Sequence, residues 1–299
     1  MATRGPLRDE DPLVDLCLAD LRDALGLATS RGTWLDSVLR PLARRFAGTV
    51  RQFDDRVDTI GLAAASIWLM QGLAGGLRVD GSAHIPANGP LLVLANHPGM
   101  TDTTALFASL HMRADLRVIA LDRPFLRAMP HVASRLIFAS GQGPSRMRTV
   151  RAGIEHLRQG GALLTFPAGA IEPDPVAVGA GPAVDALAGW SSSFALWVRA
   201  VPGTRVVPAI VGQVVSAQAL HHPLTRLRTG EDNRNKLAAA LQLLWRPYQA
   251  LPARVAFGAP IALHAHRSAD MRQTILARAS ALIEAAATDT HEPPAGLRY

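Results

Sequence analysis

The sequence predicts an α/β protein, with a sheet flanked by helices behind an N-terminal helical region. From residue 79 onward, short apolar and β-rich runs alternate with longer helical runs, as in a protein built from strand and helix units. Before residue 79, leucines recur at helical spacing. The chain has 299 residues, 48% of them hydrophobic and 18% charged, which is enough to bury a sizeable core.

Residues 13–58 are expected to be helical. Within 35–53, apolar residues alternate with arginines at positions 40, 44, 45 and 51. A basic amphipathic helix of this kind is either an ordinary surface helix or one that lies on an anionic membrane surface. Residues 60–77 carry no charge but contain Gln71, four glycines and much alanine, so we expect a buried or interfacial helix rather than a transmembrane span.

The remaining elements follow in order after residue 79, where we place a domain boundary. Residues 1–78 form the helical, possibly membrane-interfacial region, 79–287 the sheet domain, and 288–299 a loose tail. Strands are predicted at 91–95, 116–120, 162–166, 205–214 and 253–257, and helices at 103–110, 147–158, 184–198, 235–249 and 268–287. Four tryptophans lie on apolar faces and are expected in the core: Trp68, Trp190, Trp197 and Trp245.

Composition excludes several classes of protein. The single cysteine, Cys17, rules out an intrachain disulfide framework and a Cys-rich zinc site, and it suits a reducing compartment. The net charge is +7, but Lys236 is the only lysine and aromatic residues make up only 5% of the chain, so nucleic acid is not an expected partner. The acidic residues near the N-terminus stand where a secretory signal needs an apolar run, so no targeting peptide is expected.

The sharpest chemical feature is the run NHPGMTD at residues 96–102. It lies between the predicted strand at 91–95 and the predicted helix at 103–110, and α/β proteins keep their sites at such strand ends. Pro98 and Gly99 turn the chain, which allows His97 and Asp102 to fold back toward each other. An imidazole paired with a carboxylate is a general base, because the carboxylate fixes the tautomer and the free ring nitrogen accepts a proton.

Taken alone, the same run is also typical of a simple turn. In that reading Thr101 or Asp102 only caps the following helix. The motif fixes three positions and is moderately specific by itself.

The segments around this run resemble the glycerolipid acyltransferase superfamily of the 1-acylglycerol-3-phosphate type, PlsC-like. Asn96, His97 and Asp102 match the signature Asn-His-x-x-x-x-Asp after an apolar strand. Four further blocks agree in order and spacing over about residues 79–265: the lead-in at 79–93, GGALLTFPAG at 160–169, VVPAI at 206–210 and VAFGAPI at 255–261.

The resemblance implies a mixed sheet flanked by helices and an O-acyltransferase of phospholipid biosynthesis. A fatty acyl group would move from acyl-CoA or acyl carrier protein to a hydroxyl of a lysophospholipid or glycerol-phosphate-like acceptor. His97 would deprotonate that hydroxyl and Asp102 would orient His97. The resemblance also places Asn96, Phe166, Pro167 and Gly169 around the substrate. It implies a cytoplasmic protein held peripherally on the inner face of the cell membrane, with an anionic lipid surface as partner.

Two positions depart from the family pattern. In the family's third block, GGALLTFPAG at 160–169, Ala168 stands where the usual glutamate would be, while Glu172 stands four residues further on as a candidate substrate-binding residue. The arginine that the family uses for the acceptor phosphate would fall near Ser140. Arg146 and Arg148 follow, and either they bind a phosphate or they are the solvated start of the next helix.

Other motifs support no different enzyme. The runs GQG at 141–143 and GWSSS at 189–193 are incomplete as a dinucleotide fingerprint and a nucleophile elbow. The histidine pairs at 221–222 and 264–266 lack a third ligand, so neither a metal nor a cofactor is expected. Two alternatives stay open: the same chemistry on a non-phosphate lipid acceptor, and a catalytically silent relative that binds acyl chains or membranes.

Overall fold

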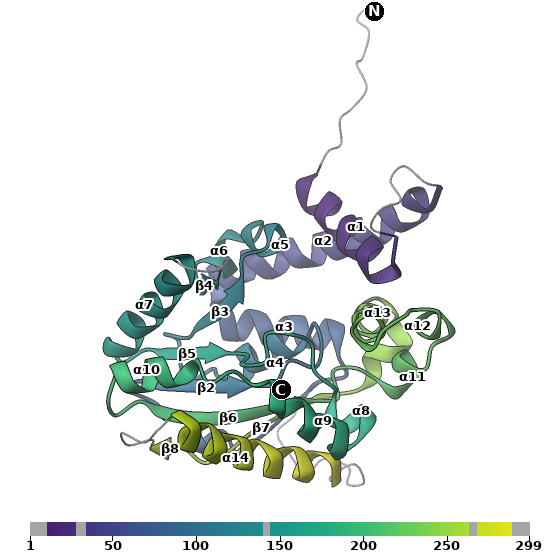
Figure 1. The fold of residues 1–299 in the computed structure, drawn as a ribbon. Coiled ribbons are helices and arrows are strands. Elements are labelled where there is room, and N and C mark those ends of the chain that lie inside the picture. Colours follow the sequence, from purple (N-terminus) through teal and green to yellow (C-terminus); the bar gives the residue numbers. More distant parts are fainter. Residues whose placement is uncertain (1–10, 28–33, 140–143, 263–267, 289–299) are drawn as a thin grey trace, which may run out of the picture.

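The protein is built around one mixed sheet (Figure 1). The computed structural model describes residues 11–27, 34–139, 144–262 and 268–288. Within them, eight strands form a sheet in the order β1-β7-β6-β2-β5-β3-β4, with β8 paired to β6. The strands are β1 (Leu77–Asp80), β2 (Leu91–Ala95), β3 (Arg117–Leu121), β4 (Leu136–Ala139), β5 (Ala162–Thr165), β6 (Arg205–Gly212), β7 (Ala253–Phe257) and β8 (Ile261–Ala262).

Strand β2 lies at the centre of a parallel block. It pairs in parallel with β5 and β6, and β3 pairs in parallel with β5 and β4. Strand β7 runs antiparallel to β6 and parallel to β1, so the sheet is mixed, as predicted. The carboxyl ends of β2, β5, β3 and β4 therefore meet at one edge of the sheet, where α/β proteins hold their sites.

Helices cover both faces of the sheet. The longer ones are α1 (Pro12–Leu25), α2 (Trp34–Ile60), α3 (Leu62–Leu73), α4 (Asp102–Ser109), α7 (Pro144–Arg158), α9 (Ala180–Ala186), α10 (Phe194–Ala200), α13 (Glu231–Leu244) and α14 (Ser268–Thr288). Short ones are α5 (Pro124–Arg127), α6 (Pro130–Ala133), α8 (Pro175–Val178), α11 (Ala217–Leu220) and α12 (Pro223–Arg226), with 3-10 turns η1 (Ser82–His84), η2 (Leu187–Gly189) and η3 (Arg246–Ala250).

The central strand divides the core into two halves. Leu91 and Val93 pack in the cluster that includes α1 to α4, whereas Leu92 and Leu94 pack in the cluster formed with α9, α10 and α14. All four side chains are fully buried. A strand buried on both faces is an uninterrupted apolar run rather than an alternating one, which is why this strand stands out in the sequence.

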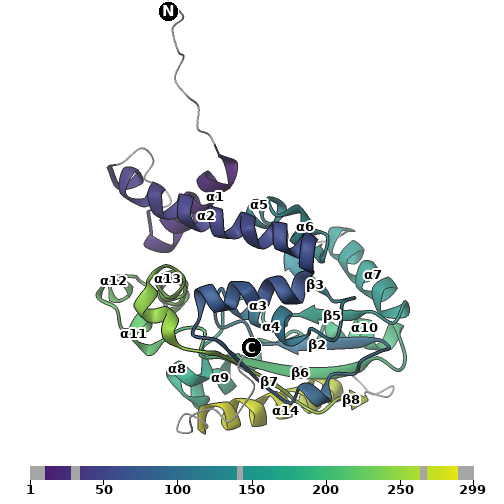
Figure 2. The ribbon, with the colours of Figure 1, turned by 180° about the vertical axis from the view of Figure 1, so that it is seen from behind.

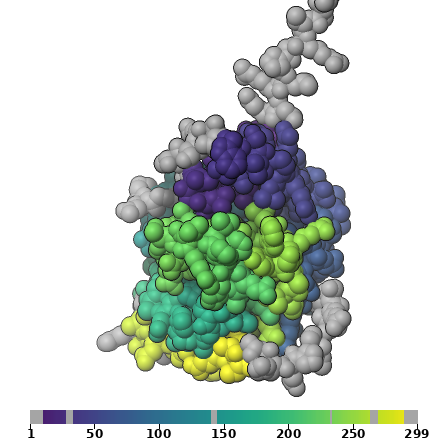
Figure 3. All heavy atoms as spheres, turned by 90° about the vertical axis from the view of Figure 1, so that its right-hand side faces the viewer, coloured from purple at the N-terminus to yellow at the C-terminus, as the bar shows by residue number. Residues whose placement is uncertain are grey.

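The N-terminal helices pack onto the sheet domain. Helix α2 contacts α1, α3 and α6, and α3 contacts α4. Seen from behind, α2 lies above α3 (Figure 2), and from the side α1 and α2 lie above the green α11 to α13 (Figure 3). Gly61, at φ +83°, separates α2 from α3. No helix in the described residues is both long and apolar enough to span a membrane.

Part of the basic face of α2 is engaged by α1. Arg40 pairs with Asp15 at 3.1 Å, and Arg51 pairs with Asp11. Trp34 and Val38 of α2 remain 76% and 61% exposed. The amphipathic helix expected from the sequence is therefore present, and Arg40 and Arg51 on it already have acidic partners.

Several element predictions are wrong in detail. The helix predicted at 184–198 is divided into α9, η2 and α10, because Gly189 and the three serines after Trp190 are poor helix formers. The helix predicted at 235–249 starts earlier, after Gly230, and ends at Leu244, before the 3-10 turn that contains Pro247. Strand β4 was not predicted. Trp190 and Trp197 are buried as expected, but Trp245 is 56% exposed.

The predicted domain division at residue 78 stays a prediction. Strand β1 begins at Leu77 and pairs with β7, so its first two residues, Leu77 and Arg78, precede the predicted sheet domain of 79–287. Residues 289–299 of the predicted loose tail lie outside the described part of the chain.

Candidate active site

The site begins where β2 ends. Asn96 follows the last strand residue and is 2% exposed. Its side chain donates to the carbonyl of Val211 at 2.8 Å and accepts from the amide of Val211 at 2.7 Å. The side-chain amide thereby extends the pairing of β2 with β6 and fixes the point at which the chain turns. Asn96 lies in the site, but the nitrogen and the oxygen of its side-chain amide both bond to β6.

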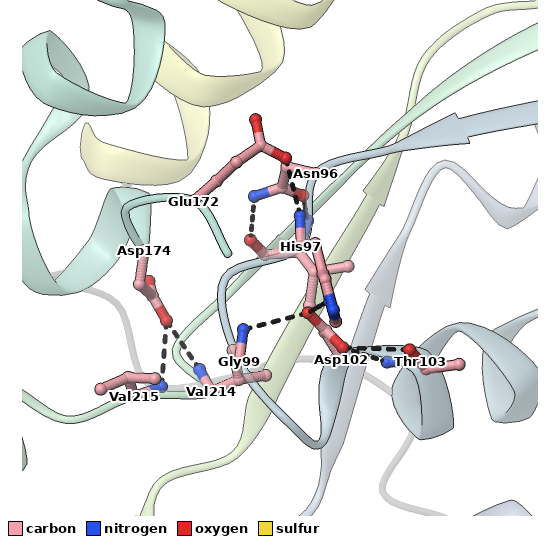
Figure 4. A network of polar contacts seen from close by, with 10 residues as sticks. Asn96, His97, Gly99, Asp102, Thr103, Glu172, Asp174, Val214 and Val215 are labelled. Carbon is pink, nitrogen blue, oxygen red and sulfur yellow. Dashed lines mark hydrogen bonds and ion pairs between the residues drawn. The ribbon is translucent and has the colours of Figure 1, made fainter. Parts of the chain in front are cut away.

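His97 and Asp102 form a close pair (Figure 4). Nδ1 of His97 and Oδ2 of Asp102 are 2.7 Å apart. The side chain of Asp102 is fully buried, whereas that of His97 keeps 31% of its surface exposed. The turn at Pro98 and Gly99 therefore brings the two side chains together as predicted.

Asp102 is held in this orientation by three further donors. The amide of Gly99 donates to Oδ2 at 3.0 Å, and Thr103 donates to Oδ1 from its amide at 2.5 Å and its hydroxyl at 3.2 Å. The acidic side chain also lies in the first turn of α4, where negative charge is favoured by the helix dipole. An ionised Asp102 accepts Nδ1–H of His97 and leaves the lone pair on Nε2.

The electrostatic surroundings of His97 favour its protonated form. Burial lowers its pKa, but the charge and hydrogen bond of Asp102, with the charge of Glu172, outweigh burial, so the pKa of His97 lies above its ordinary value of 6.5. The positive charge of Arg123 acts in the opposite direction on the same pKa. A histidine with a raised pKa keeps its proton to a higher pH than a free imidazole does.

Glu172 lies on the backbone side of His97. Its Oε2 accepts from the amide of His97 at 2.9 Å, and its Oε1 accepts from the indole Nε1 of Trp190 at 2.7 Å. Glu172 is 6% exposed. Burial raises the pKa of Glu172 from 4.5 to about 7, against the hydrogen bonds from Trp190 and His97, which lower it.

Asp174 fixes a second loop behind the turn. Its carboxylate accepts from the amides of Gln213, Val214 and Val215 at 2.8–3.1 Å. Gln213 has a positive φ of 61°, which non-glycine residues rarely adopt. A Cβ added at Gly99 would lie 3.2 Å from side-chain atoms of Val214 and Val215, so this loop limits the space beside the His97 turn.

The third block borders His97 from β5. The rings of Phe166 and His97 have centroids 4.7 Å apart and are tilted by 33°. The amide of Gly169 donates to the carbonyl of Phe166 at 3.1 Å, and Gly169 has φ +66°. Pro167 is buried, and its carbonyl accepts from the amide of Ser191 at 3.0 Å. Phe166 thus contacts the candidate base directly, while Pro167 and Gly169 shape the turn beneath it.

The arginines predicted for a phosphate are not gathered around His97 by any described contact. Arg146 and Arg148 lie exposed in the first turns of α7, after β4. The position of Ser140 lies outside the described residues. Sequence reasoning missed Arg123, an exposed residue just after β3 whose charge reaches His97. Its place after an apolar strand was the signal that could have indicated it.

The remaining features of the described residues place no further group in the site. No cluster of three or more His, Cys, Asp or Glu side chains suited to a metal ion occurs in them. A cavity of about 630 Å³ lies near the far end of α4, between β1 and the junction of α2 and α3. Its lining includes Leu77, Phe107 and Leu116, but neither His97 nor Asp102.

The comparisons with known proteins include a distant structural likeness. No family model and no curated protein matches the chain. Among solved structures, the chain is similar to the 1-acyl-sn-glycerophosphate (LPA) acyltransferase PlsC from Thermotoga maritima, with 15% identity and a TM-score of 0.48. The match covers 95% of this chain and 98% of that chain. A likeness at this level assigns no activity, so the function has to be argued from the site.

Proposed function

We propose that the chain is an O-acyltransferase that moves a fatty acyl group from a thioester to the hydroxyl of a lysophospholipid or glycerol-phosphate-like acceptor. The thioester is acyl-CoA or an acyl carrier protein. One observation carries the proposal: His97 lies 2.7 Å from the fully buried Asp102 while its ring stays partly exposed at the carboxyl edge of the sheet. That is the geometry of a general base open to substrate.

The chemistry proceeds by direct transfer. Nε2 of His97 takes the proton of the acceptor hydroxyl as its oxygen attacks the thioester carbonyl carbon. The new C–O bond forms and the carbonyl oxygen becomes negatively charged. Its return to a carbonyl breaks the C–S bond, and the departing thiolate receives the proton from His97. Asp102 stabilises the imidazolium between these two proton transfers.

The neighbours of His97 favour direct transfer over an acyl-enzyme. Among the described residues, no serine, threonine or cysteine side chain forms a hydrogen bond with the imidazole, whose polar side-chain partner is Asp102. The cysteine of the chain, Cys17, is buried in α1, and burial together with Asp20 raises its pKa to about 12. Without a protein nucleophile on His97, the substrate hydroxyl is the group that the base activates.

Arg123 supports an acceptor that carries phosphate. It is an exposed cation whose charge acts on the pKa of both His97 and Asp20 of α1, so it is within electrostatic range of the candidate base. A guanidinium binds phosphate by two parallel hydrogen bonds. Arg146 and Arg148 are further candidates at the same edge of the sheet, on α7.

A lipid surface is the natural partner of this reaction, because both substrates carry acyl chains. The exposed Trp34 and Val38 on α2, beside the exposed Arg45, are suited to an anionic interface. This contact would hold the protein peripherally on the inner face of the cell membrane.

An acceptor panel tests the proposal. Labelled acyl-CoA and acyl carrier protein are supplied with lysophosphatidic acid, glycerol 3-phosphate and monoacylglycerol, using wild type and Arg123→Gln. We expect a phosphorylated acceptor to be acylated and Arg123→Gln to raise its KM about tenfold or more. Transfer to monoacylglycerol that is equal in both proteins would indicate the non-phosphate acceptor, and no transfer in any combination would favour the silent relative.

A further inference from the structure

The carboxylate of Glu172 binds the main chain of His97, and the sequence alone did not show what this residue does. The third block carries Ala168 where the resembled family has glutamate, and Glu172 follows four residues later. We propose that Glu172, anchored by Trp190, is a positioning residue that holds the backbone of His97 and thereby aims its imidazole at the acceptor hydroxyl. The part of the proposal that concerns catalysis rests on the proposed function, whereas the part that concerns His97 geometry does not.

Glu172 and His97 are joined in both directions. The amide of His97 donates to Oε2 of Glu172 at 2.9 Å, and the amide of Glu172 donates to the carbonyl of His97 at 2.9 Å. The main-chain amide and carbonyl of His97 are thus both tied to one residue. Asp102 meanwhile holds the ring of His97 from the other side (Figure 4).

The second oxygen of the carboxylate has its own anchor. Oε1 of Glu172 accepts from Nε1 of Trp190 at 2.7 Å, and Trp190 is 2% exposed. Trp190 is fixed in turn, because its amide donates to the carbonyl of Leu187 at 3.0 Å and its carbonyl accepts from Nε of Arg272 on α14 at 3.0 Å. A connected path therefore runs from α14 through Trp190 and Glu172 to His97.

The donor pattern explains why a carboxylate is required. Both polar neighbours, the His97 amide and the Trp190 indole, are N–H groups that only donate. A carboxylate accepts from both, whereas an amide side chain accepts from one and turns its own NH₂ toward the other. Since both oxygens of Glu172 are engaged and the residue is 6% exposed, a positioning role fits these contacts better than the substrate contact expected from the sequence.

The charge of Glu172 also reaches the imidazole. It is one of the groups that raise the pKa of His97, after Asp102. Removal of this charge is expected to lower the pKa of His97, and loss of the backbone anchor to change the environment of its ring. Both effects are visible in the spectrum of the free protein, independently of any substrate.

The test uses Glu172→Gln, Trp190→Phe, the double variant and a matched control, Trp197→Phe. Trp197 is 4% exposed in the same half of the core and also donates its indole N–H, at 3.1 Å, but to the carbonyl of Val150. The full chain labelled with ¹⁵N-histidine is titrated by NMR, with His97→Gln used to assign the signal. Steady-state acyl transfer and thermal unfolding are measured on the same proteins.

We expect Glu172→Gln and Trp190→Phe each to lower kcat about tenfold or more with little change in KM, as partners of a positioned catalytic group do. Glu172→Gln also lowers the pKa of His97. Trp197→Phe lowers the melting temperature but leaves kcat and the His97 titration unchanged. In the double variant, kcat falls by less than the product of the two single fold-losses. The reason is that Trp190→Phe removes the indole N–H that the side-chain amide introduced by Glu172→Gln would otherwise face.

Two results would overturn the proposal. One is a His97 titration in Glu172→Gln that matches wild type, and the other is a Trp197→Phe variant that moves kcat and the titration as far as Trp190→Phe does. If wild type transfers no acyl group, the proposed function fails, and the NMR titrations alone still decide whether Glu172 positions His97.

Discussion

The proposed chemistry depends on one imidazole, that of His97. His97 keeps part of its ring exposed, while its partner Asp102 is fully buried and bound by Gly99 and Thr103. A buried carboxylate that accepts several hydrogen bonds needs no reorganisation energy during a reaction, because its donors are already oriented. The candidate base therefore has its orientation fixed in the free protein.

The pH dependence of the rate follows from the pKa of His97. The base works only when it is neutral, and Asp102 and Glu172 raise its pKa above 6.5 despite the opposing effect of burial. The value of kcat/KM should therefore rise as pH increases through this raised pKa and then level off. Measurement of kcat/KM from about pH 5.5 to 9 checks this, and a rate that is flat over that range would contradict a titrating His97.

Only part of this site could be predicted from residues in sequence. His97 and Asp102 are five positions apart on one turn, so a local motif carries their pairing. Glu172 lies 75 positions from His97 in the sequence. Trp190 is linked to His97 through its hydrogen bond to Glu172. Both contacts require the folded sheet, in which β2 and β5 are paired. Arg123 becomes relevant for the same reason, because neighbouring strand ends bring it near the site.

At the scale of elements, a buried arginine ties the amino edge of the sheet together. The side chain of Arg113 is 1% exposed and pairs with Asp115 through two hydrogen bonds of 2.8 Å. It also donates to the carbonyls of Pro86, Gly89 and Gly160 at 2.8–3.0 Å. One guanidinium thus joins the loops that precede β2, β3 and β5.

Removal of the Arg113 side chain should destabilise the fold but leave the site around His97 unchanged. Arg113→Ala leaves three carbonyls without their donor, so we expect the free energy of unfolding to fall by about 2–4 kcal/mol. Urea unfolding followed by circular dichroism measures it. The exposed Arg117→Ala is the control, with an expected change below about 0.5 kcal/mol. Equal losses in the two variants would contradict the account of Arg113.

The elements themselves were predicted where local signals are strong. Strands β2 and β7 have the bounds predicted for them, 91–95 and 253–257. The break between α9 and α10 follows from Gly189 and the serines after Trp190, whose weak helix propensity was outweighed in the prediction by the apolar spacing around them. Strand β4 is as short as the predicted β5, but it lies at the edge of the sheet and only one of its four residues is buried, whereas all four residues of β5 are buried.

At the scale of the whole molecule, the N-terminal helices leave apolar side chains uncovered. Trp34 and Val38 on α2 are 76% and 61% exposed, although the core beneath α2 is continuous with that of the sheet. The chain carries a net charge of +7. An apolar pair on a cationic protein is suited to the headgroup region of an anionic bilayer.

Vesicle binding tests this surface. The double variant Trp34→Ser, Val38→Ser should lower the partition coefficient onto phosphatidylglycerol vesicles about tenfold or more, because burial of such side chains contributes about 1.5–3 kcal/mol each. Leu196→Ser, which alters a 47% exposed leucine on α10, is the control and should bind as wild type does. Co-sedimentation at two salt concentrations measures both, and an equal loss in the control would contradict a specific membrane face.

We propose that His97, oriented by Asp102, activates the hydroxyl of the acceptor. Its most direct test is the rate of thiol release from acyl-CoA that depends on lysophosphatidic acid, compared among wild type, His97→Gln and Asp102→Asn. We expect release in wild type and a loss of about 10²–10⁴-fold in each variant, with the folds intact by circular dichroism. Release at the wild-type rate in His97→Gln would contradict this proposal.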